Sequence, residues 1–297
     1  MGVWRKQLQL LTTMFGNEGE ERLVMGTGPH RVCVTVAVHG NEPAGVLAVR
    51  ELMDEGLLPA GVGDGVTLTV LLGNPAAFRD DKRFVDANLN RAFTEATLTK
   101  DAAACCYEER RAGELWALGM GECDAYLDLH STSTDSPAMA LPAEAECSVA
   151  LAQVLPVGYV VRKLAHMTAS GGTTLDLMLA RRPSVPAVCI ECGGHRQASS
   201  VLVARQAILA MAQGATVVRG ADCPPPTVLS AVGIRRCGPA FAWLRSVSAF
   251  QTVPAGTPLY RDDEVGEFVT ENECILVMPT SLPVEGEEAY FETVRDH

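Results

Sequence analysis

Three stretches of the sequence carry residue types that could bind a metal ion. An unbroken β-branched run over 32–38 stops at His39, and Glu42 follows three residues later. A second apolar run, 125–129, leads directly into His130. Imidazole and carboxylate groups are usual ligands of a catalytic zinc ion, which takes three protein ligands and keeps a fourth position for water. His39, Glu42 and His130 form such a set if the fold brings them together.

Each of these residues also has a structural interpretation. His39 and Glu42 stand between a strand and a helix that Pro43 could begin, so they could simply cap and solvate that junction. For His130 the alternative is a core histidine with a satisfied hydrogen bond. Asp128 favours the metal interpretation, because it lies two residues before His130 on the same face of a strand. From there it could accept the second N–H of the imidazole.

The elements around these residues predict how they are positioned. Strand 32–38, a helix over 43–57 and strand 66–72 form a βαβ unit, which predicts a parallel strand pair. Strand 125–129 adds to the same pattern. Ligands of open parallel sheets bind outside the carboxyl ends of the strands, and both histidines would emerge there. The sequence thus predicts an α/β fold, with a largely parallel mixed sheet flanked by helices.

A third strand, 186–190, ends at another candidate, Glu191. A carboxylate beside a zinc site can take a proton from water and pass it to a leaving amine, a role worth about 10²–10⁴-fold in rate. The alternative is that Glu191 caps a helix that starts near residue 197. His166 and His195 are expected to be solvent-facing or supporting residues rather than catalytic ones.

The composition restricts the class of protein. The chain has 297 residues, 47% of them hydrophobic, and a formal net charge of -12, which allows a sizeable core and argues against nucleic acid as the main partner. No charge-free run of about 18 apolar residues appears, so a membrane span is not expected. Ten cysteines without a secretion signal indicate reduced thiols and a cytoplasmic location. Cys189 and Cys192 form a C-x-x-C without a second pair, so core packing is expected for both.

The chain divides near residue 220. Three consecutive prolines at 224–226 mark a change in composition, and the short β-like runs beyond them are separated by Gly, Pro and acidic turns. We therefore expect a zinc-dependent catalytic domain over 1–219 and a small C-terminal all-β domain over 220–297. Within the first domain, the polar stretch 76–99 is predicted to be a long ordered loop, and such loops are usually functional.

Four short motifs, in this order along the chain, resemble the succinylglutamate desuccinylase/aspartoacylase family, a branch of the zinc carboxypeptidase-like fold. The motifs are His39-Gly-Asn-Glu42, the loop from Arg83 to Arg91, Asp128-Leu-His130-Ser-Thr and Ile190-Glu191-Cys-Gly-Gly. The resemblance covers roughly residues 30–215. A β-rich C-terminal domain is also what the family would show.

The resemblance implies a role for each matching residue at the metal centre. His39, Glu42 and His130 match the ligands of one zinc ion per chain. Glu191 matches the residue that acts first as general base and later as general acid. Arg83 matches an arginine that polarises the acyl carbonyl and stabilises the oxyanion.

Further residues match positions that bind the substrate. Asn90 and Arg91 resemble a pair that holds a substrate carboxylate, and a guanidinium suits this task because it forms two parallel charge-assisted bonds. Arg181 or Arg182 lies near the place of another substrate-facing arginine. Tyr290 resembles a tyrosine that reaches in from the C-terminal domain.

Two departures from the family pattern leave the substrate open. Asn88 stands where some members have an acidic residue, so the support of Arg83 is expected to differ. The segment after Glu191 reads Cys-Gly-Gly-His, which is not the form of the characterised aspartoacylases.

The activity implied by the resemblance is zinc-dependent hydrolysis of the amide bond in a small anionic N-acyl amino acid, of the N-succinyl or N-acetyl type. The alternatives are a zinc carboxypeptidase acting on short peptides, a related amide or ester deacylase, and a non-catalytic relative that binds a metal or ligand. The sequence leaves open the acyl group, the amine, the metal used in the cell and the oligomeric state, and a homo-oligomer is compatible with it.

Overall fold

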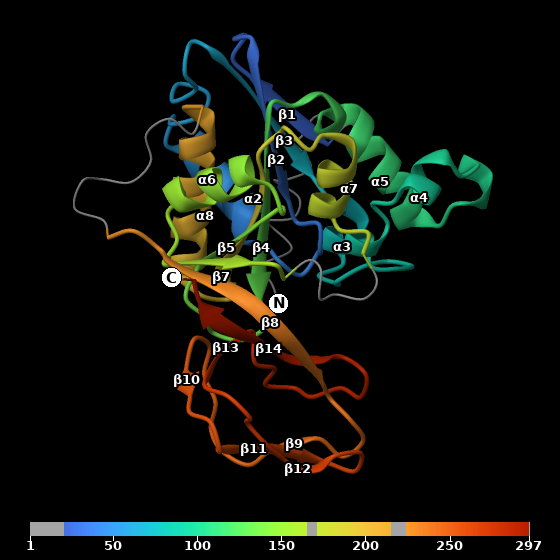
Figure 1. The fold of residues 1–297 in the computed structure, drawn as a ribbon. Coiled ribbons are helices and arrows are strands. Elements are labelled where there is room, and N and C mark those ends of the chain that lie inside the picture. The colour runs from blue at the N-terminus through green and yellow to red at the C-terminus, as the bar shows by residue number, and fades with distance from the viewer. Residues whose placement is uncertain (1–20, 165–170, 215–223, 297) are drawn as a thin grey trace.

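The computed structural model describes residues 21–164, 171–214 and 224–296. Its central feature is one large mixed sheet with the strand order β1-β3-β2-β4-β7-β5-β6-β8-β14-β13-β10 (Figure 1). These strands are β1 (Arg22–Met25), β2 (His30–Val36), β3 (Val66–Leu72), β4 (Ala125–Thr132), β5 (Met139–Pro142), β6 (Tyr159–Arg162), β7 (Ala187–Gly194), β8 (Thr227–Arg236), β10 (Thr252–Val253), β13 (Cys274–Val277) and β14 (Glu288–Arg295).

Helices cover both faces of the first half of this sheet. They are α2 (Ala44–Asp54), α3 (Pro75–Arg79), α4 (Glu95–Thr99), α5 (Tyr107–Leu118), α6 (Glu146–Val154), α7 (Thr174–Arg181) and α8 (Ala198–Ala212), with short 3-10 turns η1 (Leu89–Arg91), η2 (Ala102–Ala104) and η3 (Met120–Glu122). Helices α2, α6 and α8 pack on one face, and α5 and α7 pack on the other (Figure 1). None of the helices in the described ranges combines the length and apolar character that a membrane crossing needs.

Four neighbouring strands, β3, β2, β4 and β7, pair in parallel at the centre of the first half of the sheet. Every residue from Val32 to Val36 is at most 1% exposed, because helices lie on both sides of β2. This double burial explains why the run is β-branched and apolar without alternation. The α/β architecture predicted from the sequence is therefore confirmed. The sheet is mixed because β5 runs antiparallel to β7.

The predicted loop 76–99 contains more regular structure than expected. It holds most of α3, the turn η1 and the helix α4. Asn74 caps α3 by accepting the N–H of Ala77, and Thr94 caps α4 by accepting the N–H of Thr97. Asn and Thr are preferred at this position, since their side chains satisfy an N–H that has no partner within the helix.

The C-terminal segment is built of strands, as predicted, but it is not confined to a separate sheet. Strand β8 pairs in parallel with β6, and β14, β13 and β10 then extend the large sheet by antiparallel pairing. A second, three-stranded antiparallel sheet contains β9 (Ala242–Trp243), β11 (Pro258–Asp262) and β12 (Gly266–Val269). The boundary predicted between 219 and 220 falls in 215–223, outside the described residues, and stays a prediction.

Candidate active site

The turn between β2 and α2 holds the first two candidate ligands. His39 and Glu42 are 4% and 3% exposed. The Gly40 N–H donates to the carbonyl oxygen of Arg83 over 3.2 Å. A side chain on Gly40 would come within 2.2 Å of the backbone of Ala77, so only glycine fits at this crossing. Pro43 takes the N-cap position of α2, one residue before the position expected for it.

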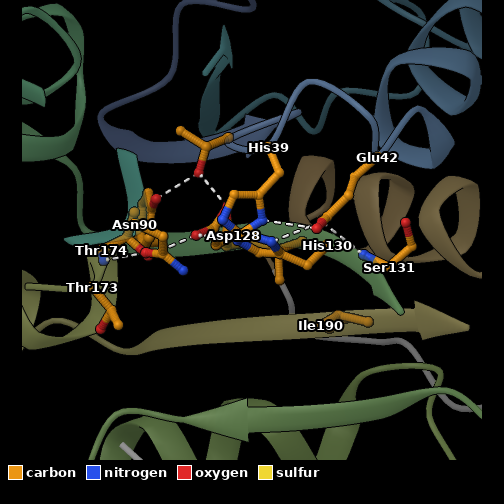
Figure 2. A network of polar contacts seen from close by, with 12 residues as sticks. His39, Glu42, Asn90, Asp128, His130, Ser131, Thr173, Thr174 and Ile190 are labelled. Atoms are coloured by element: carbon orange, nitrogen blue, oxygen red, sulfur yellow. Dashed lines mark hydrogen bonds and ion pairs between the residues drawn. The ribbon is translucent and has the colours of Figure 1, made fainter. Parts of the chain in front are cut away.

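The structure brings His39, Glu42 and His130 together, and Figure 2 shows their side chains pointing toward one another. Glu42 Oε1 lies 2.7 Å from His39 Nδ1, and Glu42 Oε2 lies 2.9 Å from His130 Nδ1. The two imidazole centroids are 5.0 Å apart. One possible ligand atom from each of the three residues lies within 4.8 Å of the others. Strands β2 and β4 are neighbours, which is why residues 91 positions apart in the sequence meet here.

The outer nitrogen of His130 has the partner that the sequence suggested. His130 Nε2 lies 3.0 Å from Asp128 Oδ2. Asp128 is fully buried and also accepts hydrogen bonds from Thr35 Oγ1 at 3.0 Å and Thr174 Oγ1 at 2.6 Å. With its oxygens held in this way, Asp128 accepts the imidazole N–H and keeps Nδ1 of His130 directed at Glu42.

The outer nitrogen of His39 faces Asn88. The distance from His39 Nε2 to Asn88 Oδ1 is 3.0 Å, and the same oxygen accepts the backbone N–H of Asn90 at 2.9 Å. Asn90 Oδ1 accepts the N–H of Thr174 at 3.1 Å. Asn88 thus orients His39, whereas the family resemblance linked Asn88 to the support of Arg83.

The charges of His39, Glu42 and His130 shift one another's pKa values. Burial alone would raise the pKa of Glu42, but the attraction of His39 and His130 holds that pKa well below its usual range. Burial would lower the pKa of His130, but Asp128 and Glu42 on either side of it raise that pKa well above its usual range. Burial lowers the pKa of His39, partly opposed by Glu42. A buried carboxylate pair around one imidazole therefore requires a positive charge at this point.

These residues fit a zinc ion. The set offers two imidazole nitrogens and one carboxylate oxygen, a ligand set found in hydrolytic zinc sites. A divalent cation would supply the positive charge that a proton on His130 supplies in the protein alone. The outer hydrogen bonds to Asp128 and Asn88 are the kind that fix metal-binding imidazoles in place.

Glu191 faces the same cavity. It lies on β7 as the register partner of His130 on β4. Its Oε2 atom is buried and has no hydrogen-bond partner among the residues that the structure describes. Burial raises the pKa of Glu191 to about 7, with the positive charge of His130 opposing the shift. A carboxylate that titrates near neutral pH and has an unused oxygen is suited to accept and return a proton.

The loop residues also line this cavity. Arg83 Nη1 lies 3.3 Å from Glu42 Oε1, and the Arg83 side chain is 48% exposed. Asn90 and Arg91 line the cavity beside it. Arg91 Nη1 donates to the carbonyl oxygen of Asn90 at 2.7 Å.

Glu108, on α5, positions this loop and was not identified from the sequence. It is fully buried, and its carboxylate accepts the backbone N–H groups of residues 85, 86 and 87 at 2.7, 3.0 and 3.1 Å. Asn74 Nδ2 donates to it as well, at 3.0 Å. Three of these four hydrogen bonds fasten the segment that leads from Arg83 to Asn88, and the fourth ties the same carboxylate to Asn74. In the sequence Glu108 looks like an ordinary acidic residue in the first turn of a helix.

The cavity has a volume of about 310 Å³. One part of its lining carries the His–Glu–His cluster, Glu191 and the loop residues, and another part comes from β5, β6 and the C-terminal segment. Glu288 and Phe291 of β14 belong to this second part. The C-terminal segment thus contributes to the cavity, although not through the residue that the sequence suggested.

Tyr290 and Arg181 do not line the cavity. Tyr290 is fully buried in the C-terminal core beside Trp243 and Tyr260. Neighbouring residues of a strand point to opposite faces, so Phe291 lies against the cavity and Tyr290 faces away from it. Arg181 lies at the carboxyl end of α7, where its guanidinium pairs with Glu95 at 2.6 Å. The expected substrate contacts of these two residues therefore have no support in the structure.

The remaining candidates have structural placements. Arg182 donates to the carbonyl oxygens of Gly121 and Cys123, away from the cavity. His195 lines the cavity, with its Nδ1 2.8 Å from Ser131 Oγ. His166 lies outside the described residues.

The C-x-x-C cysteines belong to two different packing clusters. Cys192 packs in the cluster on the α2 and α8 face of the sheet, and Cys189 packs in the cluster on the α5 and α7 face. Burial raises the pKa of both thiols well above the ordinary value. The two residues lie three positions apart on one strand, so their side chains point to opposite faces, in line with the predicted core packing.

The fold resembles that of several solved structures. A succinylglutamate desuccinylase/aspartoacylase from Rhodobacter sphaeroides superposes with a TM-score of 0.72 and 16% sequence identity, over 93% of this chain and 89% of that one. Murine aminoacylase 3 gives a TM-score of 0.67 and 20% identity, over 91% of this chain and 96% of that one. At these identities the likeness establishes the fold alone.

Sequence comparison establishes the family. A family model described as the succinylglutamate desuccinylase/aspartoacylase catalytic domain matches residues 29–215, which is more than half of the chain. The chain therefore belongs to this family, and the resemblance recognised in its motifs is confirmed.

Parts of the sequence are similar to an amidohydrolase and to a desuccinylase. An N-acyl-aromatic-L-amino acid amidohydrolase from Danio rerio is 37% identical over 113 residues, which is 35% of this chain and 35% of the relative. A succinylglutamate desuccinylase from Yersinia enterocolitica is 31% identical over 121 residues, which is 38% of this chain and 36% of the relative. The match spans about a third of the length of these curated relatives.

Proposed function

We propose that the chain is a zinc-dependent amidohydrolase that cleaves an N-acyl amino acid into a carboxylate and a free amino acid. The observation that carries the proposal is one cavity in which a buried His–Glu–His cluster meets a second glutamate with an unused buried oxygen. Membership of the family supports the reaction type, as do relatives named for N-acyl amino acid hydrolysis.

His39, Glu42 and His130 would hold one zinc ion. When bound, zinc supplies Lewis acidity, which lowers the pKa of water and polarises a carbonyl oxygen. The outer partners Asp128 and Asn88 keep the imidazoles in a binding orientation, because each accepts the N–H that points away from Glu42.

Glu191 acts as the proton carrier. It takes a proton from water as the water oxygen bonds to the acyl carbon. As the carbon–nitrogen bond breaks, it returns this proton to the amine nitrogen. A pKa raised to about 7 suits both proton transfers: near neutral pH the carboxylate is basic enough to accept the proton, and the protonated carboxyl group is acidic enough to return it.

Arg83 stabilises the negative charge that develops on the carbonyl oxygen. Its guanidinium approaches the cluster from the loop, 3.3 Å from Glu42. Removing such a contact commonly lowers the rate by about 10²–10³-fold. Asn90 and Arg91 bind the carboxylate of the substrate, and Glu108 holds the loop that presents all three.

A hydrolysis screen tests the proposal. Purified protein is treated with a chelator, divided, and assayed with and without added zinc against N-acetyl and N-succinyl amino acids and against dipeptides. We expect zinc-dependent release of free amino acid from the N-acyl substrates and little release from dipeptides. Preferred cleavage of dipeptides would instead identify a carboxypeptidase, and zinc-independent release would contradict the assigned metal centre.

A further inference from the structure

The positive charge that lines the cavity comes from few residues. Within the described ranges, Arg83 and Arg91 are the arginines on its wall, and no lysine lies there. Arg83 is directed at the metal cluster, where its Nη1 lies 3.3 Å from Glu42. Arg91 makes no ion pair with a described residue and contacts the carbonyl oxygen of Asn90. One guanidinium is therefore available for one substrate carboxylate.

A second wall of the cavity, which we call the apolar wall, carries mostly apolar side chains. It is lined from β5, β6, β14 and the residues just after β6 and β13 by Leu141, Val161, Leu164, Met278 and Phe291, with Thr280 and Glu288 as polar neighbours. Val161 and Phe291 are 1% and 4% exposed, so this wall belongs to the packed core of the sheet.

An acidic residue, Glu288, also lines the cavity on the side of the apolar wall. Glu288 reaches the cavity and lies 3.6 Å from Arg236, which is not among the lining residues. Among the described residues, this pair leaves no uncompensated positive charge on the apolar wall. A second substrate carboxylate would therefore meet apolar carbon and a like charge.

We propose that the cavity selects N-acyl amino acids that carry a single carboxylate, with an uncharged, apolar side chain and an uncharged acyl group. This inference rests on the proposed function and narrows its substrate class. A carboxylate moved from water to an unpaired apolar site loses its hydration without compensation, whereas an apolar group gains from the same transfer. The volume of about 310 Å³ favours small substrates, because it lies at the lower end for ligand cavities.

Two substrate series test the selection. In the first, the acyl group is acetyl and the side chain is that of Leu, Met, Phe, Asp, Glu or Lys. In the second, the amino acid is Leu and the acyl group is acetyl or succinyl. We expect kcat/KM for the apolar side chains to exceed that for Asp, Glu and Lys by about tenfold or more, and acetyl to exceed succinyl by a similar factor. A preference for the dicarboxylates, or for the lysine derivative, would overturn the inference.

Binding provides a second readout that does not depend on turnover. The Glu191→Gln protein, loaded with zinc, is titrated calorimetrically with N-acetylleucine and N-acetylaspartate. We expect Kd to be about tenfold lower, or better, for N-acetylleucine. Equal or tighter binding of N-acetylaspartate would contradict the charge argument.

A charge added to the apolar wall should shift this selection. Leu164→Arg and Met278→Arg place a second guanidinium at partly buried positions, and Val265→Arg is the matched control at a 56% exposed position away from the cavity. We expect either wall variant to raise the ratio of kcat/KM for N-acetylaspartate over N-acetylleucine about tenfold, with the control unchanged. If both wall variants fold, as judged by circular dichroism, and leave the ratio unchanged, the inference fails.

The outcomes separate this inference from the proposed function. Zinc-dependent cleavage that favours acidic N-acyl amino acids would overturn the substrate class and leave the amidohydrolase intact. No cleavage of any N-acyl amino acid by zinc-loaded protein would overturn both.

Discussion

The substitution Glu191→Gln removes one titrating carboxyl group and keeps the shape of the side chain. Two effects should follow. As the proposed proton carrier, Glu191 contributes about 10²–10⁴-fold to the rate, so kcat should fall by that factor while the zinc content stays at the wild-type level. As a partly buried acid with one buried carboxylate oxygen, it should also affect the stability of the metal-free protein in a pH-dependent way.

The size of the stability effect follows from the pKa. Burial raises the pKa of Glu191 from 4.5 to about 7 in the folded protein. The folded state thus binds the proton more tightly than the unfolded state, so this group favours folding below about pH 4.5 and its contribution is lost as the pH rises toward 7. With about 1.4 kcal/mol per pKa unit, the loss at pH 8 is at most about 3.5 kcal/mol. Gln cannot ionise and avoids this loss.

Urea unfolding of chelator-treated protein at pH 5 and pH 8 measures the effect. The free energy of unfolding of the Gln variant, relative to the wild type, should be higher at pH 8 than at pH 5 by about 2–3 kcal/mol. Glu267→Gln, the same change at an exposed position on β12, is the matched control and should show no such difference. A pH-independent difference, together with an undiminished kcat, would refute both the buried-acid and the proton-carrier assignments.

Three further predictions concern the metal centre, the loop and a surface arginine. Lowering the pH should weaken zinc binding, because Asp128 and Glu42 raise the pKa of His130 and zinc must displace the proton held there. Zinc affinity measured with a competing chelator at several pH values checks this, and an affinity that does not change with pH would count against it. Glu108→Gln replaces a carboxylate that accepts three N–H groups of the loop, and should lower kcat/KM by about tenfold or more at unchanged zinc content. An unchanged kcat/KM would show that the position of the loop does not depend on this carboxylate. Arg181→Met removes the ion pair with the exposed Glu95 and should leave kcat/KM unchanged. A raised KM at unchanged kcat would instead support the substrate contact predicted for Arg181 from the sequence.

The sequence predicts the centre of the fold well, because that part depends on local pattern. The run 66–72 coincides with β3, and each of the other three predicted runs overlaps a strand. The predicted ends are shifted, because β2 ends at Val36, before His39, whereas β4 and β7 continue to Thr132 and Gly194, past His130 and Glu191. Full burial by helices on both faces produces apolar strands, and a chemical residue near the carboxyl end of each stands out against them.

The parts that the sequence misses depend on long-range contacts. Strands β5 and β6 have four residues each, too few for a periodic pattern. The Glu108 contacts join a helix to a loop about twenty residues away through backbone N–H groups, which leave no mark on residue types. The sequence predicts a cavity contact for Tyr290, one residue away from Phe291, which lines the cavity instead. Neighbouring side chains of β14 point to opposite faces, so Tyr290 is directed into the C-terminal core.

The central claim is that His39, Glu42 and His130 hold one zinc ion. Metal content measured by inductively coupled plasma mass spectrometry on purified protein tests it most directly, with His130→Ala and Glu191→Gln as companion variants. We predict one zinc per chain for the wild type and for Glu191→Gln, and a loss of zinc from His130→Ala. Wild-type protein that takes up no zinc, or a His130→Ala variant that retains a full equivalent, would contradict the account.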